Sequence, residues 1–427
     1  MNKLTGLSVK ERTALLYNPL TKECYDGEKH FTATKIEINQ WSITKSYTSK
    51  YVPIKCPEHR TLEEAHSDFV KQADKLKEQS NGLINLYKTG TLKRASLALF
   101  FYMANKNEYV PEELTDMEIE WLNNTNHGQL VYLEPAEGSP LDVKDMPLHS
   151  YDINAFYNSL MRDVHFKIPI KQGTFKTIES KDFNKLQFFQ YGIYRVIIEQ
   201  PRKVTLEPDM DEDDYEKYFH YRTCKKIFRF NKNNYYTSID LNVAKKLKLN
   251  MSIIEDGTHN FLSYGSGTTL TGSQLFGFFV KDLYKLRTET KNKDFKLIMN
   301  LLWGSLCETN ISHYQYDVTK GGINIDIDTK KYDILNQYFV RDNIFKIEYC
   351  KKNNYYKYPW ARMKPFLLAF GRQKLGRVMM PYIDTVMTVN TDGFKTYREI
   401  DIQTGTGIGE VRYEGIALKE NRFENKK

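Results

Sequence analysis

Two short segments far apart along the chain each place an aspartate at the end of an apolar run, and they constrain the fold more than any other feature. Residues 148–162 read LHSYDINAFYNSLMR, where Asp152 stands between an apolar stretch and a helix-like run. Residues 384–398 read DTVMTVNTDGFKTYR, which predicts a strand, a tight turn around Asp392 and a second strand. Both aspartates have structural explanations, because Asp is a common helix N-cap and suits hairpin turns that need positive φ. Taken singly, neither segment decides between a structural and a chemical role.

A helical hairpin is predicted between these two segments, over residues 277–304. Its first arm ends near Arg287, and the polar run 288–293 makes the turn. Asp294 is expected to cap the second arm.

On the second arm, Lys296, Asn300 and Gly304 stand four residues apart, a spacing that lines them along one helical face. A lysine, an amide and a bare backbone position opposite an arginine could grip a triphosphate while a base pair approaches closely. The alternative is an ordinary helix with a solvated lysine, and the spacing does not choose between them.

Composition narrows the class of protein. The chain has 427 residues, enough for two or three domains, and its 14% of aromatic residues argues against widespread disorder. The formal charge of +8 favours a polyanionic partner, although a diffuse lysine excess also occurs in proteins that bind none. The five cysteines include no Cys-x-x-Cys pair, so neither a zinc cluster nor a disulfide framework is expected, and a reducing intracellular compartment fits. No apolar run is long enough to cross a membrane.

Several other stretches have clear local patterns. Helices are predicted over residues 61–82 and 110–123, and a buried strand over 191–199. The acidic residues between 209 and 216 are expected to form a solvated loop rather than a metal site. Residues 26–28, Asp-Gly-Glu, are expected to lie in a hairpin loop, because Asp-Gly is a turn signal.

Residues 220–238 alternate basic and aromatic side chains, and residues 351–364 repeat the pattern. Such interleaving suits a surface that neutralises phosphates and stacks on bases. The alternative for the first segment is an edge strand with an ordinary basic face. The basic members of that segment are Arg222, Lys225, Lys226, Arg229 and Lys232.

Taken in order, three of these segments resemble the sequence motifs of family B DNA polymerases, most closely the protein-primed members found in phages, viruses and linear plasmids. Residues 152–159, DINAFYNS, look like the first palm motif, Asp-x-x-Ser-Leu-Tyr-Pro-Ser. Residues 296–304, KLIMNLLWG, are similar to the fingers motif, Lys-x-x-x-Asn-Ser-x-Tyr-Gly. Residues 390–393, NTDG, match Asp-Thr-Asp-Ser of the second palm motif. The motif positions that depart from the family are Leu301, Trp303, Asn390 and Gly393.

The resemblance implies a catalytic centre with two magnesium ions. Asp152 and Asp392 would be both the catalytic carboxylates and the metal ligands, with the carbonyl of Ile153 as a further ligand. Hard, hydrated Mg²⁺ prefers carboxylate oxygen and substrate phosphate, which agrees with the lack of His or Cys ligands. One metal would lower the pKa of the primer 3′-hydroxyl, and both would stabilise the displacement at the α-phosphate.

The resemblance also implies sites for nucleotide and DNA. Tyr157 would stack beneath the incoming sugar and exclude a 2′-hydroxyl, while basic residues of the helical hairpin would neutralise the β and γ phosphates. The implied nucleotide-binding residues are Tyr157, Arg287, Lys291, Lys296 and Asn300. The implied DNA-binding residues are Gly128, Gly304, Thr391 and Lys426.

The implied fold is α+β: a right-hand polymerase with an antiparallel palm sheet, helical-hairpin fingers, two insertions, a partial thumb and a truncated exonuclease-like N-terminal region. On this basis the chain is expected to be truncated at both ends and to lack proofreading. The expected divisions are 1–140 for the exonuclease-like region and linker, 141–200 for the first part of the palm and the start of insertion 1, 201–270 for insertion 1, 271–309 for the fingers, 310–364 for insertion 2, 365–412 for the second part of the palm and 413–427 for the start of the thumb.

The implied function is that of a DNA-directed DNA polymerase, which adds deoxynucleotides to a primer paired with a DNA template. The expected setting is an intracellular, protein-primed replication system of a mitochondrial plasmid or a virus. Expected partners are the DNA template-primer, a dNTP and a terminal priming protein, and no membrane. One alternative is a catalytically impaired fragment that only binds nucleic acid, and another is a module that binds only the priming protein.

Overall fold

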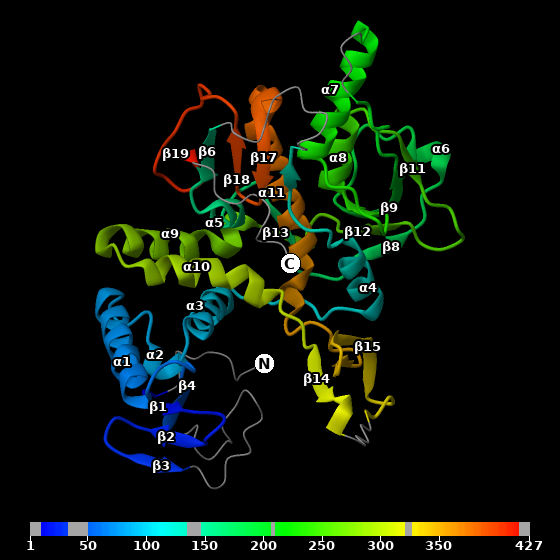
Figure 1. The fold of residues 1–427 in the computed structure, drawn as a ribbon. Helices are drawn as coiled ribbons and strands as arrows, with labels where there is room; N and C mark the ends of the chain where they lie inside the picture. Colours follow the sequence, from blue (N-terminus) through cyan, green and yellow to red (C-terminus); the bar gives the residue numbers. More distant parts are fainter. Residues whose placement is uncertain (1–9, 33–49, 135–146, 206–209, 321–326, 418–427) are drawn as a thin grey trace. The chain divides into compact units, whose positions relative to one another are not determined.

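The computed structural model describes residues 10–32, 50–134, 147–205, 210–320 and 327–417. These residues form a mixed α+β chain that divides into two compact units (Figure 1). Unit 1 is drawn from Met1–Val110 and Leu275–Leu306, and unit 2 from Pro111–Gln274 and Cys307–Lys427. Both units are therefore discontinuous in sequence, and the polypeptide passes between them three times.

The N-terminal part of unit 1 is a four-stranded sheet in the order β3-β2-β1-β4. β1 runs antiparallel to β2 and parallel to β4, and four of its five residues are buried. In the turn after β2, the Asp26 side chain accepts hydrogen bonds from the backbone N–H groups of Glu28 and Lys29. The predicted hairpin loop at residues 26–28 is confirmed. The strands are β1 (Thr13–Tyr17), β2 (Glu23–Tyr25), β3 (His30–Thr32) and β4 (Tyr51–Lys55).

Helix α1 confirms the helix predicted over residues 61–82. It begins after Thr61 because Thr61 and Glu64 form a capping box, in which each side chain accepts the other's backbone N–H. Its buried residues recur at the spacing of one helical face, as in Ala65, Phe69 and Ala73. The helices lying wholly or mostly in unit 1 are α1 (Leu62–Gln79), α2 (Leu86–Thr89), α3 (Leu92–Lys106), α9 (Gly272–Thr290) and α10 (Lys293–Leu306).

α9 and α10 form the predicted helical hairpin, with one correction at the turn. The predicted cap, Asp294, lies inside α10, because the residue before the helix is Asn292 and its side-chain oxygen accepts the N–H of Asp294 at 3.0 Å. Asp294 instead accepts a hydrogen bond from the Gln72 amide on α1 at 3.1 Å. α10 also packs along α3, where the buried Ser96 hydroxyl donates to the Ile298 carbonyl at 2.7 Å. The hairpin is thus anchored on the N-terminal helices of its own unit.

Unit 2 contains a five-stranded antiparallel sheet in the order β19-β6-β18-β17-β5. β17 and β18 form the predicted hairpin: Asn390 pairs with Gly393, and Thr391 takes a left-handed conformation with φ 61°. Asp152 lies within β6, so the alternative of a helix N-cap at this residue is wrong; the cap position of the next helix is Ala155. The strands are β5 (Val131–Leu133), β6 (Leu148–Ile153), β17 (Val386–Asn390), β18 (Gly393–Thr396) and β19 (Val411–Ala417).

A second sheet of unit 2 has β9 at its centre, paired with β10, β11 and β12. β9 confirms the buried strand predicted over residues 191–199, since five of its seven residues are buried. The strands of this sheet are β8 (Thr174–Lys176), β9 (Gly192–Ile198), β10 (Tyr235–Thr237), β11 (Met251–Ile253) and β12 (Phe261–Ser263). A two-stranded sheet, β7 (Lys167–Pro169) with β13 (Thr269–Thr271), lies in the same unit.

Helix α7 corrects two predictions. The acidic residues between 209 and 216 are not a loop where the structure describes them, because Asp211 caps α7 by accepting the N–H of Asp214 at 2.8 Å. The acidic first turn that follows complements the positive end of the helix dipole. Most of the segment 220–238 is not an edge strand either, since α7 continues to Ile227 and a loop follows; only its end, Tyr235–Thr237, forms the edge strand β10.

The remaining elements complete unit 2. α4 begins at Asp116, later than the start predicted at residue 110, because its capping box is Thr115 with Glu118. A three-stranded sheet has the order β14-β16-β15. The strands are β14 (Ser312–Asp317), β15 (Tyr332–Arg341) and β16 (Ile344–Lys351), and the helices are α4 (Asp116–Thr125), α5 (Phe156–Met161), α6 (Ser180–Phe183), α7 (Glu212–Ile227), α8 (Ser238–Lys246), α11 (Met363–Met379) and the 3₁₀ helices η1 (Val318–Lys320), η2 (Pro359–Arg362) and η3 (Met380–Thr385).

A fully buried ion pair lies inside unit 2. Arg362 of η2 donates through Nε and Nη2 to the two carboxylate oxygens of Glu118 of α4, at 3.1 and 2.7 Å. Glu118 also accepts hydrogen bonds from the Gly173 N–H and the Tyr264 hydroxyl. Segments separated by more than 200 residues are therefore held at one buried charge pair. In the parts of the chain that the structure describes, no helix is both long and apolar enough to span a bilayer.

Candidate active site

The backbones of the two predicted catalytic aspartates meet where two inner strands of the five-stranded sheet, β6 and β18, end and begin. β6 and β18 pair so that Asp152 lies opposite Gly393, the residue after Asp392. The N–H of Ile153 donates to the carbonyl of Asp392 at 3.0 Å. Residues that are 240 positions apart in sequence are thus neighbours across two adjacent strands. The sheet brings together Asp152, Ile153 and Asp392, the predicted set of metal ligands.

Gly393 is explained by this close approach. A Cβ placed on Gly393 would lie 2.7 Å from the carbonyl oxygen of Tyr151 and 3.5 Å from a carboxylate oxygen of Asp152. A side chain at this position would push against the backbone of β6. The departure from serine at Gly393 therefore fits the tight spacing of these two strands.

The donor set at these strand ends fits magnesium. Asp152 keeps 28% of its side-chain surface exposed, and Asp392 is half-buried, so water and substrate could reach both. Two carboxylates and a main-chain carbonyl leave further coordination positions to water and phosphate, as Mg²⁺ prefers. Among the described residues, no group of three or more His, Cys, Asp and Glu is placed to hold a metal.

Arg412 is a charged neighbour of Asp152 that the sequence did not indicate. β19 pairs with β6 so that Arg412 lies directly opposite Asp152, and its Nη2 is 3.4 Å from the carboxylate. The same nitrogen also contacts the carboxylate of Glu414. The cation becomes recognisable only once the register of β19 is known, because nothing in the local sequence relates it to residue 152.

The Tyr157 hydroxyl lies close enough to Asp392 for the carboxylate charge to affect its pKa. Burial, and then the negative charge of Asp392, raise the pKa of the Tyr157 hydroxyl, while Arg372 acts in the opposite direction. The phenol is therefore neutral at physiological pH. Tyr157 follows a turn at Ala155, which has a left-handed φ of 47° and leads from β6 into α5.

Arg372 of α11 holds the loop that carries Gly128. Its Nη2 and Nε donate to one carboxylate oxygen of Asp240, at 2.8 and 3.3 Å, and its Nη1 donates to the Gly128 carbonyl. Although burial acts to raise it, the pKa of Asp240 lies below its usual value because of the charges of Arg372 and His127. Gly128, predicted to contact DNA, thus uses its carbonyl internally, while a Cβ at this residue would meet no atom within 4 Å. The sequence did not single out Arg372 or Asp240.

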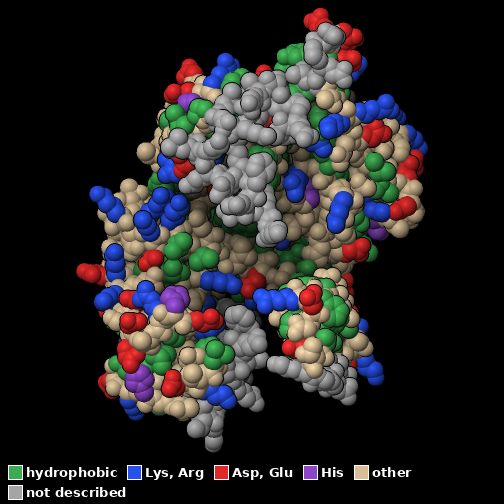
Figure 2. Space-filling view, viewed as in Figure 1, with side chains coloured by type: hydrophobic (Ala, Val, Ile, Leu, Met, Phe, Trp, Pro, Cys, Tyr) green, Lys and Arg blue, Asp and Glu red, His purple; other side chains and the backbone are tan. Residues whose placement is uncertain are grey.

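The predicted nucleotide-binding residues of the helical hairpin lie in unit 1. Lys296, Asn300 and Gly304 all lie on the exposed face of α10, opposite the buried Ile298 and Leu302. Figure 2 shows Lys and Arg side chains gathered over the α9–α10 hairpin. The spacing of four residues has therefore placed the predicted group on one solvent-facing surface.

The other predicted residues have simpler surroundings. Arg287 is half-buried, with its guanidinium 5.6 Å from the centre of the Tyr284 ring. Lys291 is exposed in the hairpin turn. Thr391, at the tip of the β17–β18 turn, donates its N–H to the Leu130 carbonyl at 3.1 Å. Lys426 lies outside the described residues.

Comparisons with known proteins define the family. The profile of the family described as DNA polymerase type B, organellar and viral, matches residues 61–380, well over half of the chain. The chain belongs to this family, and the membership expected from the motifs is confirmed. The matched region contains the first palm motif and the fingers motif and ends before Asp392. No curated protein is significantly similar in sequence.

Solved structures show a related fold. The DNA polymerase of phi29 complexed with single-stranded DNA superposes with a TM-score of 0.52 at 14% identity, covering 84% of this chain and 57% of that one. The phi29 polymerase complexed with primer-template DNA, a post-translocation binary complex, also gives 0.52, at 13% identity, covering 90% of this chain and 61% of that one. The chain thus spans about three fifths of the length of the phi29 enzyme. The predicted α+β class is confirmed.

Proposed function

We propose that this chain is a DNA-directed DNA polymerase that adds deoxynucleotides to a primer 3′-hydroxyl on a DNA template. The observation that carries the proposal is the pairing of β6 with β18, which puts the Asp152 and Asp392 backbones side by side at the ends of two adjacent strands. Family membership supports a nucleotidyltransferase, because type B DNA polymerases are enzymes of that class.

Asp152, Asp392 and the carbonyl of Ile153 would hold two magnesium ions. When bound, the ions would lower the pKa of the primer hydroxyl and stabilise the charge that develops at the α-phosphate. Backbone hydrogen bonds between β6 and β18 fix the two residues that would hold the ions relative to one another. Arg412 would neutralise part of the Asp152 charge and so moderate the attraction of the site for cations.

Tyr157 would form the floor of the nucleotide sugar site. A neutral, half-buried phenol would offer a rigid surface for the sugar and, as in the family, would leave no room for a 2′-hydroxyl. Arg372 would support this region indirectly, since its buried guanidinium connects α11, Asp240 and the Gly128 loop.

The exposed face of α10 would bind the nucleotide triphosphate. Lys296 supplies a positive charge for the β and γ phosphates, with Arg287 and Lys291 as further cations. Asn300 would lie beside the nascent base pair. Gly304 would let DNA approach the helix, since a Cβ there would meet nothing within 4 Å.

We propose the division into domains that the family resemblance implies. The palm would comprise residues 141–200 and 365–412, and the fingers residues 271–309. The insertions would comprise 201–270 and 310–364, with an exonuclease-like region over 1–140 and the start of a thumb over 413–427. DNA contacts would come from Gly128, Gly304, Thr391 and Lys426.

We infer that the partners are a DNA template-primer, a dNTP and a terminal priming protein. The phi29 polymerase was solved with primer-template DNA, which supports the first of these. The setting would be an organellar or viral replication element, in keeping with the family description. The second candidate is a chain that binds nucleic acid without turnover, which the substitutions at Asn390, Leu301 and Trp303 favour.

Primer extension tests the proposal. A labelled primer on a DNA template is incubated with Mg²⁺ and dNTPs, using the wild type, Asp392→Ala and the control Asp342→Ala, which removes an exposed carboxylate in the same unit. Wild type and control are expected to extend the primer, and Asp392→Ala to lose more than about a hundredfold in rate, because bound metals supply several kcal/mol to such reactions. Extension that survives Asp392→Ala, or a wild type that binds the duplex without extending it, would overturn the proposal.

A further inference from the structure

A pocket of about 830 Å³ opens in unit 2 beside α8 and α11, which pack against each other (Figure 1). The segment that leads from α5 into β7 and the segment before β9 complete its wall. Its volume lies within the range of small-ligand sites. The lining residues used below are Asp163, Lys167, Ser238, Asn242, Phe370, Gln373, Lys374 and Arg377.

The pocket lies on the face of α11 opposite to Arg372. Phe370 and Lys374 line the pocket, and each stands two residues from Arg372, which is about 200° around a helix of 3.6 residues per turn. Arg372 itself donates to Asp240 and to the Gly128 carbonyl. α11 therefore lies between the pocket and the Gly128 loop.

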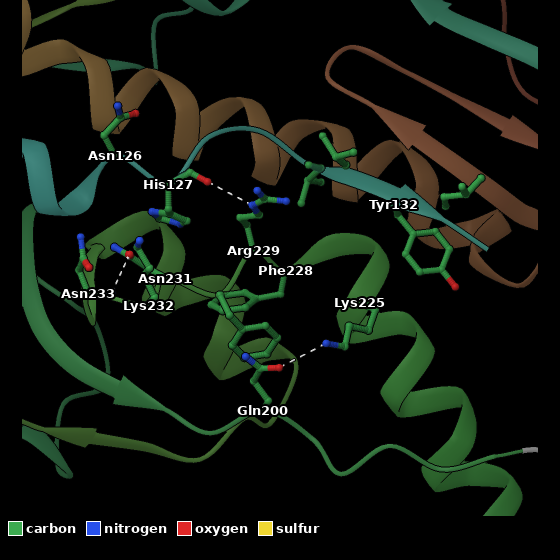
Figure 3. A pocket seen from close by; sticks show the side chains of 14 residues that line it. Asn126, His127, Tyr132, Gln200, Lys225, Phe228, Arg229, Asn231, Lys232 and Asn233 are labelled. Carbon is green, nitrogen blue, oxygen red and sulfur yellow. Dashed lines mark hydrogen bonds between the residues drawn. The ribbon is translucent and has the colours of Figure 1, made fainter. Parts of the chain in front are cut away.

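A smaller pocket, of about 530 Å³, belongs to the catalytic region instead (Figure 3). Leu130 in its wall accepts the N–H of Thr391, the residue before Asp392. Val131, also in its wall, pairs with Asn390. We therefore assign no separate ligand to the smaller pocket.

The first turn of α8 brings polar groups without a partner to the larger pocket. The Thr237 side chain caps the N–H of Asp240, which leaves the N–H groups of Ser238 and Ile239 without an intrahelical acceptor. Ser238 lines the pocket and is only 3% exposed, and no described residue forms a hydrogen bond with its hydroxyl. A buried hydroxyl and free N–H groups at the positive end of a helix favour an anion.

Cations from α11 and β7 give the pocket a positive charge. Arg377 is exposed, and in the described part of the chain no carboxylate forms an ion pair with it. Lys374 lies 3.7 Å from Asp163, beyond hydrogen-bond distance, so it remains able to bind a ligand. Lys167 is a further exposed cation. Because these three cations face one carboxylate, the pocket suits a ligand that carries more than one negative charge.

Phe370 offers a fixed ring surface in the same pocket. It stacks on the buried Phe166, with ring centres 5.7 Å apart and an angle of 16° between the planes. Phe370 is only half-buried, so part of its ring remains open to the pocket. It stands seven residues before Arg377 on one face of α11, about 10 Å along the axis. The ring and the exposed guanidinium therefore lie about two helical turns apart.

We propose that this pocket binds a nucleoside diphosphate. The base stacks on Phe370, and the two phosphates lie against Arg377, Lys374 and the first turn of α8. The amides of Gln373 and Asn242, which form no hydrogen bond with any described residue, supply partners for the ribose. Binding here requires neither a metal ion nor Asp392, so the site is independent of the proposed catalytic centre.

Fluorescence anisotropy of ADP that carries a methylanthraniloyl fluorophore tests the proposal, in EDTA to remove any binding that needs a divalent cation. Arg377→Ala and Phe370→Leu are each expected to weaken binding by roughly tenfold, and Ser238→Ala by roughly fivefold. The matched controls are Arg398→Ala, an exposed cation beyond β18, and Phe339→Leu, an exposed ring of β15. Both controls are expected to bind the probe as the wild type does.

Competition with unlabelled compounds identifies the ligand chemistry. ADP is expected to displace the probe at least about tenfold more effectively than pyrophosphate or adenosine, because only ADP engages both the ring and the cations. Displacement by pyrophosphate as effective as that by ADP would overturn the nucleotide assignment, since it would leave only a site for inorganic anions.

Lys296→Ala separates this pocket from the proposed triphosphate site on α10, and it is expected to bind the probe normally. Binding that is lost in Lys296→Ala but kept in Arg377→Ala would contradict the proposal. A further measurement does not depend on how the variants fold: wild-type protein is irradiated with 8-azido-ADP, and the adducts are mapped by mass spectrometry. Adducts are expected within residues 163–167, 238–242 or 370–378, and adducts confined to other segments would refute the assignment.

Discussion

Arg412 places a positive charge beside one of the two proposed metal ligands. Its Nη2 lies 3.4 Å from the Asp152 carboxylate, on the neighbouring strand of the same sheet. Asn390, where the family motif has an aspartate, removes a negative charge from the same region. Both features reduce the negative potential that attracts a divalent cation. The site is thus less strongly charged than its motif alone would indicate.

Substituting Arg412 is expected to strengthen cation binding. Removal of one positive charge near 4 Å is worth on the order of 1 kcal/mol in well-hydrated surroundings, so Arg412→Ala should bind Mn²⁺ about fivefold more tightly than the wild type. Isothermal titration calorimetry without DNA measures this directly, and Arg398→Ala is the control for a charge lost elsewhere in unit 2. Equal affinities for all three proteins would show that Arg412 does not act on the site.

Helix α7 is tied to the end of β5 through Glu134. Arg222 contacts its carboxylate at 2.7 Å, and Lys226 lies 3.9 Å from it while donating to the Ile383 carbonyl at 2.8 Å. Burial, and then the charge of Arg222, lower the pKa of Lys226 to about 8, although Glu134 and Asp384 act to raise it. The folded protein therefore gives up a proton from Lys226 more readily than the unfolded chain does.

This shift predicts a pH dependence with a definite sign. Between about pH 8 and the usual lysine pKa, the unfolded state binds more protons at Lys226, so this group makes the free energy of unfolding rise with pH, by up to about 1.4 kcal/mol per pH unit. Lys226→Met should remove this rise. The free energies of unfolding of the wild type and Lys226→Met are measured in urea at pH 7.5, 8.5 and 9.5. Buried thiols and phenols titrate in both proteins, so their contribution cancels when one free energy is subtracted from the other. A difference that does not change with pH would contradict the shifted pKa.

Sequence patterns predicted those helices and strands whose signals lie in neighbouring residues. Turn chemistry at Asn390, Thr391 and Gly393 predicted the β17–β18 hairpin, and the repeating apolar face predicted α1. The start of α7 was missed because the acidic residues read as a solvated run, although Asp211 followed by Asp214 has the spacing of a helix cap. Arg222 could not be recognised as buried, since its partner Glu134 lies far away in sequence.

At the scale of the whole molecule, the Glu118–Arg362 pair joins distant segments of unit 2. Arg362→Met alone leaves a buried, unpaired carboxylate and is expected to cost about 3 to 5 kcal/mol of unfolding free energy. The double variant Glu118→Gln with Arg362→Met should recover more than about 1 kcal/mol, because the amide is uncharged yet still accepts the hydrogen bonds of Gly173 and Tyr264.

Urea unfolding followed by tryptophan fluorescence measures both variants. Trp121 and Trp360 report on the region, since they lie on α4 and η2, the two elements that the pair connects. A double variant that is no more stable than Arg362→Met would show that the unpaired charge is not the source of the loss.

The order of three motifs was enough to predict the family and the α+β class, because the palm and fingers patterns together are specific even where each is ambiguous. The pairing of β19 with β6 was not predictable, and so Arg412 was missed. Arg372 was missed for a similar reason: its partners Asp240 and Gly128 come from two other segments and meet only in the folded unit. Contacts of this kind depend on tertiary register rather than on local pattern.

The packing of α10 on α3 gives the N-terminal quarter of the chain a structural role that does not depend on nuclease chemistry. Through Ser96, Gln72 and the stacked rings of Phe100 and Phe276, residues encoded before position 110 support a hairpin encoded after position 272. Deleting the segment before residue 110 would expose the apolar face of that hairpin to solvent. The face that carries Lys296 would then lose the packing that supports it. The early segment is therefore expected to be needed for the stability of the hairpin.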